Sequence, residues 1–212
     1  MAITRDRPQR SLTMSLALYV SDLIDRFASY MTELSKTYDT PFPEGRSLFP
    51  ADCPAVDSPE HVDMRPFRAV YMSIVGGIMW IATMVDCTIS FAVAQLARNL
   101  SNPSKLCWQS ALRVLRYLQT HTSTLVFSPD VTRGLEVYID SSWLSTYSCS
   151  GALFYYHGCL FAWYSKRSAQ YRCPVQRPST SPLCLPHGRS FSTERCLWNC
   201  RDKSAGQLSC SL

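Results

Sequence analysis

Apolar residues recur every three or four positions near the beginning of the chain. This spacing places side chains on one side of a helix, because an α-helix turns once in about 3.6 residues. The pattern therefore predicts an amphipathic helix over residues 12–29, with Asp22, Asp25 and Arg26 on its solvent side. The predicted buried face consists of Leu16, Tyr19, Val20, Leu23, Ile24 and Phe27.

Prolines and acidic residues interrupt this pattern over residues 38–66. A proline inside a helix removes a backbone hydrogen bond and clashes with the preceding turn. We therefore predict a linker without a regular helix, and a domain boundary near residue 60. The prolines are Pro41, Pro43, Pro50, Pro54, Pro59 and Pro66.

Residues 67–100 are the most apolar part of the chain and contain one polar break. They predict two packed helices joined by a short turn. Pro103 ends the second of these helices. Ser104 is then a suitable N-cap for a third helix over residues 105–119. This helix is expected to bury Trp108, Ala111, Leu112, Leu115 and Leu118, with Arg113 and Arg116 directed elsewhere.

Beyond Thr122 the apolar positions form short runs of aromatic and β-branched residues, which predict a meander of strands. His157 and Gly158 are typical of a tight hairpin turn between the last two strands. Beyond residue 170, prolines alternate with Ser, Thr, Arg and Cys without an apolar face, so this tail is predicted to be disordered. The predicted strands are 125–127, 135–139, 152–156 and 159–164.

Charge and cysteine content narrow the setting in which the chain works. It has 21 basic and 16 acidic residues, a net charge of +5 that suits a phosphate-bearing partner without requiring one. No run of 18 apolar residues occurs and four of the first ten residues are charged, so we expect no membrane segment and no signal peptide. We expect an intracellular protein, cytoplasmic or nuclear, whose ten cysteines are reduced.

Several isolated features have plain structural interpretations. Gly76 and Gly77 lack a preceding strand and a following Lys-Ser or Lys-Thr, so they predict close helix packing and not a phosphate loop. Cys196 and Cys200 lack a second ligand pair, and we predict no metal site there. The three isolated histidines are expected at the surface or in turns; they are His61, His121 and His157.

The apolar helices also carry a long ordered motif. Residues 73–83 read SIVGGIMWIAT and residues 89–98 read ISFAVAQLAR; LSNPSK follows at 100–105 and ALRVLRYL at 111–118. This order closely resembles the block that follows the polymerase core in copia-type retrotransposon Pol polyproteins.

Weaker matches extend the resemblance to both sides. Residues 3–7 resemble the strand after that family's palm domain, and residues 138–143 resemble its first ribonuclease H strand. Gly151, Trp163 and Lys166 fall where the family has the following hairpin. The resemblance covers about residues 1–168, and is closest from 68 to 128.

The resemblance implies an α+β fold: a helical thumb and connection segment, then a truncated ribonuclease-H-like β-sheet and a disordered tail. Residues 1–60 would end the reverse transcriptase with a thumb-like helix and the Pro-rich linker. Residues 61–122 would be the helical connection and 123–168 the partial sheet, which leaves an apolar face open because its covering helices are missing. Residues 169–212 would be the tail, which a shifted reading frame would explain.

Little of the family's chemistry is present in the sequence. The paired palm aspartates, which bind two metal ions during polymerisation, do not occur. Ribonuclease H needs four carboxylates, and Asp140 matches the first. Arg177 stands at the second position, and only Glu194 and Asp202 are acidic beyond it. The intact family uses Mg²⁺, but we expect no cofactor bound to this chain and no hydrolase activity.

Departures from the family also occur away from the catalytic positions. Residues 85–88 read VDCT where the family has Thr-Arg-Pro-Asp. The loop after Trp143 is short, with Tyr147 where a basic residue is usual. These changes favour a non-catalytic relic of a retrotransposon polyprotein.

Two other functions remain open. One is a subunit that complements a palm-bearing partner, and the other is a recruited nucleic-acid-binding module. For binding, Arg113, Arg116, Lys166 and Arg167 are the candidate contacts to an RNA–DNA hybrid or to a nucleic-acid backbone. We expect no small-molecule substrate.

Overall fold

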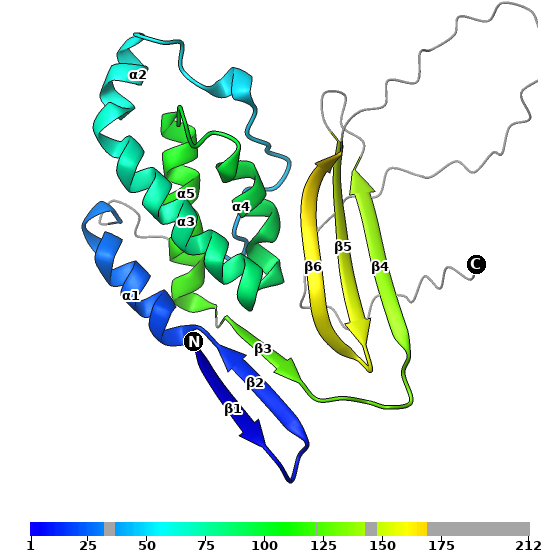
Figure 1. Ribbon diagram of the computed structural model, residues 1–212. Helices are drawn as coiled ribbons and strands as arrows, with labels where there is room; N and C mark the ends of the chain where they lie inside the picture. The colour runs from blue at the N-terminus through cyan, green and yellow to red at the C-terminus, as the bar shows by residue number, and fades with distance from the viewer. Residues whose placement is uncertain (32–36, 122, 143–147, 169–212) are drawn as a thin grey trace, which may run out of the picture.

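The computed structural model describes residues 1–31, 37–121, 123–142 and 148–168. Their elements form a helical body with two separate three-stranded antiparallel sheets (Figure 1). One sheet extends from the base of the helices, and the other stands beside α4. The predicted disordered tail lies outside the described residues.

The first sheet joins the beginning of the chain to a strand far along it. Strand β1 (Ala2–Asp6) pairs with β2 (Ser11–Ser15), and β2 pairs with β3 (Thr124–Phe127). The helix predicted from residue 12 is therefore wrong at its start, because residues 11–15 alternate polar and apolar and form a strand. The strand predicted at 125–127 is also misplaced: it joins this sheet and not the later meander.

The helical body contains the predicted helices. Helix α1 (Ala17–Phe27) and the 3₁₀ turn η1 (Ala28–Tyr30) precede the segment that leads to α3. The two helices predicted over 67–100 are confirmed as α3 (Arg68–Met84) and α4 (Ser90–Ala97), joined through η4 (Cys87–Ile89). The third is confirmed as α5 (Lys105–Thr120). As predicted, Ser104 caps it, accepting a hydrogen bond from the Cys107 N–H at 3.3 Å.

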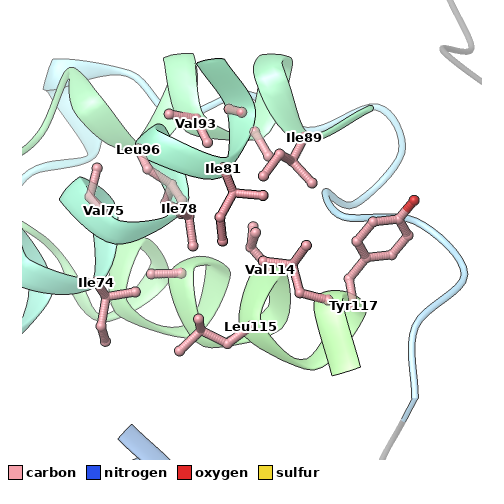
Figure 2. Close-up of a cluster of buried hydrophobic side chains, with 14 of the residues drawn as sticks. Ile74, Val75, Ile78, Ile81, Ile89, Val93, Leu96, Val114, Leu115 and Tyr117 are labelled. Carbon is pink, nitrogen blue, oxygen red and sulfur yellow. The ribbon is translucent and has the colours of Figure 1, made fainter. Parts of the chain in front are cut away.

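The core lies between α1, α3, α4 and α5. Figure 2 shows how side chains of α3, α4 and α5 converge there, with Ile78 among them. Tyr71 is also fully buried, and its hydroxyl donates to the Leu96 carbonyl at 2.8 Å. Burial raises the pKa of Tyr71 well above its ordinary value, so the hydroxyl stays a neutral donor.

The predicted linker is more ordered than its prolines indicate. It contains η2 (Pro50–Asp52), α2 (Pro59–Met64) and η3 (Arg65–Phe67). The expectation of no helix is wrong for α2, because Pro59 lies in its first turn, where no backbone donor is needed. Ser58 caps this helix by accepting from the His61 N–H at 3.2 Å. The boundary placed near residue 60 therefore falls inside a helix.

By length and composition, the helical segment Pro59–Met84 is long and apolar enough to span a membrane. Of its most apolar 18 residues, 39% are buried in the fold. Core helices of soluble proteins can be equally long and apolar. In this fold α3 packs against α1, α4 and α5, and buries Tyr71, Ile74, Val75, Ile78 and Ile81.

The two glycines of α3 have different surroundings. A Cβ at Gly77 would lie 2.5 Å from Cδ1 of Leu23, so this position brings α1 and α3 together. A Cβ at Gly76 would meet nothing within 4 Å, and Gly76 is exposed. Close helix packing is thus confirmed for Gly77 but is wrong for Gly76.

The second sheet consists of β4 (Leu135–Ser142), β5 (Ser148–Tyr156) and β6 (Cys159–Ser168), in that order. The predicted hairpin turn is confirmed: Tyr156 pairs with Cys159, and the two residues between them have φ of 49° and 74°. Positive φ at both central positions matches the right-handed twist of the strands. His157 is one of these two turn residues, as predicted.

One face of this sheet packs on the helices through β6. Trp163 lies in this face, and its indole N–H donates to the Ala82 carbonyl of α3 at 2.7 Å. The register puts Tyr138, Leu153 and Trp163 in one row, so residues that alternate with them point to the other face.

That other face carries exposed apolar side chains within the described part of the chain. Leu135 and Ile139 of β4 are 64% and 71% exposed. Tyr156 of β5 shares the row of Leu135 and is 55% exposed.

Candidate functional site

Asp140 occupies β4, an edge strand of the second sheet, and is exposed. Its cross-strand neighbour is Gly151 of β5, which in turn pairs with Ser165 of β6. The row therefore contains one carboxylate, one glycine and one hydroxyl. Within the described residues, no group of three or more His, Cys, Asp or Glu side chains converges to hold a metal ion.

The other residues weighed for hydrolysis lie outside the described residues. These are Arg177, Glu194 and Asp202, together with Trp143 and Tyr147 of the loop after β4. The same holds for Cys196 and Cys200. Their positions therefore stay predictions from the sequence.

Arg113 is held inside the protein by the segment after α1. Its Nε donates to the Thr40 carbonyl at 3.2 Å and its Nη2 to Thr40 Oγ1 at 2.9 Å. The guanidinium also lies 4.2 Å from the ring centroid of Tyr38. Partial burial lowers the pKa of Arg113, but an arginine remains charged at neutral pH. These contacts give Arg113 a structural role in fixing residues 38–40 on α5.

Arg116 has a similar role one turn further along α5. Its Nη2 donates to the Met31 carbonyl, and its Nη1 to Gln119 Oε1 at 3.0 Å. Met31 follows α1 and is buried. Both predicted phosphate contacts on α5 thus already bind groups of the chain itself.

The other two predicted cations lie near the end of β6. Lys166 is exposed, pairs with Ser150 across the sheet, and has its ammonium 5.5 Å from the ring centroid of Tyr164. The Arg167 backbone pairs with Cys149. The side chain of Arg167 lies outside the described residues. The four predicted contacts are therefore divided between α5 and β6, and do not form one described cluster.

Asp86 has a structural role that was not predicted from the sequence. Its Oδ1 accepts from the Thr88 N–H at 3.0 Å and from Thr88 Oγ1 at 2.5 Å, which caps η4. Its Oδ2 accepts from Ser123 Oγ at 3.1 Å, just before β3. An Asp two positions before a Thr was the available sequence signal. Residues 85–88, which depart from the family motif, thus form a turn in which the Asp86 carboxylate is hydrogen-bonded.

The sequence interpretation also missed three arginines of the β1–β2 hairpin. Arg5, Arg7 and Arg10 line an open groove of ≈ 740 Å³ at the end of the first sheet. All three are exposed. The only advance signal was their spacing within six residues, which gives no information about which strands complete the groove.

Comparison with known proteins indicates the origin of the chain. No protein-family model matches it, and no solved structure matches it. It is 28% identical over 170 residues to the retrovirus-related Pol polyprotein from transposon TNT 1-94 of Nicotiana tabacum. It is 33% identical over 134 residues to the putative transposon Ty5-1 protein of Saccharomyces cerevisiae.

The coverage of these two relatives is uneven. The matched parts are 78% and 62% of this chain, but only 12% of the tobacco polyprotein and 39% of the yeast protein. The chain therefore derives from a retrotransposon Pol polyprotein and spans a minor part of the length of these two relatives.

A third relative matches a shorter part of the chain at higher identity. The chain is 38% identical over 102 residues to secreted RxLR effector protein 161 of Plasmopara viticola, which covers 46% of this chain and 72% of that protein. The chain belongs to the same family as this Plasmopara viticola protein. The name of that protein describes it as secreted and as an effector.

Proposed function

We propose that the chain corresponds to the end of the reverse transcriptase region and the start of the ribonuclease H domain of a copia-type polyprotein, and that it catalyses neither reaction. The ordered motifs between residues 73 and 118 support this placement, as they fall on α3, α4 and α5 in one continuous helical body. The α+β order, in which the second three-stranded sheet follows the helices, also supports it.

Within the described residues, no group of carboxylates converges on Asp140, and this observation supports the proposed lack of hydrolysis. Two-metal hydrolysis needs several carboxylates to neutralise and hold two divalent ions about 4 Å apart. Asp140 is the match to the first carboxylate, and its row neighbours are Gly151 and Ser165. One exposed carboxylate binds Mg²⁺ too weakly to order an attacking water.

An RNA-cleavage assay tests this proposal. Purified full chain is incubated with an RNA–DNA hybrid labelled on the RNA strand, in Mg²⁺ and separately in Mn²⁺. We expect no cleavage above the rate without protein. Cleavage that the parent chain supports and Asp140→Asn abolishes would show that a complete site exists, and would overturn the proposal. Asp130→Asn, an exposed aspartate before β4, is the matched control for loss of one carboxylate.

We also propose an intracellular location. The described cysteines, which are Cys53, Cys87, Cys107, Cys149 and Cys159, are free thiols, which suits a reducing compartment. Of the two alternative functions, a specific observation favours the nucleic-acid-binding module. That observation is the arginine-lined groove of the β1–β2 hairpin.

A further inference from the structure

Strand β4 forms the edge of the second sheet that lies away from α4 (Figure 1), and among the described strands it pairs only with β5. Just before β4, the Gly134 carbonyl accepts from the His157 N–H at 3.3 Å. Backbone groups of successive residues point to opposite edges of a strand. The N–H and C=O groups of Leu135, Val137 and Ile139 therefore point outward, where another strand can bind them.

The other edge strands of the two sheets are less open to pairing. Strand β1 has five residues and includes Arg5 and Asp6. Strand β3 has only four residues and contacts β6, while β6 itself packs on α4. Strand β4 has eight residues, and none of them is a lysine or a proline, the residues that commonly oppose pairing at an edge. Among the described edges, β4 is therefore the one best suited to accept another strand.

One face of β4 also exposes apolar side chains next to this edge. Leu135, Val137 and Ile139 alternate along the strand on the face turned away from the helices, and all three are exposed. Tyr156 of β5 pairs with Leu135 and extends the same apolar row. A strand added beside β4 would cover this surface and bind the outward backbone groups at the same time.

A second copy of β4 fits this edge in an antiparallel pair. A two-fold axis perpendicular to the sheet places paired residues on the same face. With the axis at Val137, the two Val137 residues are paired, and Leu135 pairs with Ile139 of the second copy. Each of these pairs exchanges two hydrogen bonds, because the backbone groups of all three residues point outward. An axis at Ile139 or at Leu135 would instead pair Val137 with Ser141 or with Arg133.

The carboxylates of β4 favour the same register. An axis at Tyr138 would place Glu136 opposite Asp140 of the second copy, and an axis at Glu136 would place two identical carboxylates together. Like charges directly opposite each other are destabilising. With the axis at Val137, Glu136 lies opposite Tyr138, whose hydroxyl already donates to Glu136 Oε2 at 3.1 Å within one chain. The charge pattern of β4 is therefore complementary to itself in this register.

We propose that the chain forms a homodimer in which the β4 strands of two copies pair antiparallel about a two-fold axis at Val137. The two three-stranded sheets then become one continuous sheet across the interface. The assembly stops at two copies, because the β6 edge at each end packs on α4. This pairing depends on the geometry of the sheet and not on the copia-type origin, so the outcome of the RNA-cleavage assay does not affect it.

Sedimentation velocity of the full chain tests the dimer over a roughly hundredfold range of protein concentration, because a reversible dimer follows mass action. We expect monomer at the lowest concentration and dimer at the highest. Val137→Lys places two like charges at the axis and should weaken dimerisation by at least about 10-fold. Ile139→Lys, at a more exposed position of the same row, should weaken it too, and replaces Val137→Lys if that variant does not fold.

Two results would overturn the dimer. A chain that stays monomeric at every concentration would show that β4 is not used, as when another segment of the same chain covers it. Dimerisation that is unchanged in both Val137→Lys and Ile139→Lys would place the interface on another surface.

A mixing experiment tests the position of the axis. A residue on the axis meets only its own copy, so Val137→Lys and Val137→Glu should each dimerise weakly alone. Their equimolar mixture should form a heterodimer at least about 10-fold tighter than either homodimer. The matched control is Val126→Lys, at a 53% exposed valine on the edge strand β3, which should change dimerisation less than about 2-fold. Equal losses at Val126 and Val137, or no recovery in the mixture, would contradict the proposed pairing.

Discussion

Ile78→Ala is expected to lower the free energy of unfolding by about 2–5 kcal/mol, the range for truncating a fully buried isoleucine. Ile78 is 0% exposed and lies on α3, where the side chains of α4 and α5 converge (Figure 2). The substitution removes buried apolar surface and leaves a cavity in the core between α1, α3, α4 and α5. Urea unfolding followed by circular dichroism measures the change.

The neighbouring residue supplies the control. Met79 follows Ile78 in α3 but is 38% exposed, and Met79→Ala should cost less than about 1 kcal/mol. If Ile78→Ala leaves no folded protein to measure, Ile78→Val should still fold, at a cost of about 0.5–1.5 kcal/mol. Equal effects at the two positions would contradict the described orientation of α3.

Trp163→Ala is expected to loosen the second sheet from the helices, at a cost of about 2–3 kcal/mol. This lies below the range of about 3–5 kcal/mol for a fully buried tryptophan, because Trp163 is only partly buried. Its indole N–H donates to the Ala82 carbonyl, which is among the last four carbonyls of α3 and lacks a helical partner. The substitution removes both the apolar contact and this donor.

Hydrogen exchange locates the effect of this change. In Trp163→Ala, amides of β4, β5 and β6 should exchange faster, while those of α3 keep their protection. Trp163→Phe retains most of the apolar contact and should cost about 1 kcal/mol through the lost hydrogen bond. Phe161→Ala, at a 50% exposed position on the same strand, is the control. Unchanged exchange in β4–β6 would mean that Trp163 does not hold the sheet in place.

The helices were predictable because their signals are local. The apolar spacing of α5 and the Ser104 cap lie within one stretch of sequence, and both are present as predicted. The strand β2 was missed because its alternation covers only five residues beside a strong helical pattern. Its partner β3 could not be assigned, since the pairing of Met14 with Leu125 joins positions far apart in the chain.

In the candidate site too, local features were predictable and contacts between distant residues were not. Asp140 was found from its sequence neighbours, and the structure adds that Gly151 and Ser165 share its row. The partners of Arg113 were not predictable, because Thr40 lies 73 residues away and is brought near only by the fold. The arginine-lined groove likewise depends on Phe127 meeting Leu12 across two strands.

The genomic nucleotide sequence around this reading frame tests the proposed origin most directly. It should be translated in all three frames, upstream of the codon for Met1 and on both sides of the codon for Gln170. We expect upstream codons to encode the paired-aspartate palm hairpin, and a neighbouring frame downstream to restore the helix that carries the missing ribonuclease H glutamate. If no frame contains either element, the chain is not a broken piece of that polyprotein region, and the tail is a sequence in its own right.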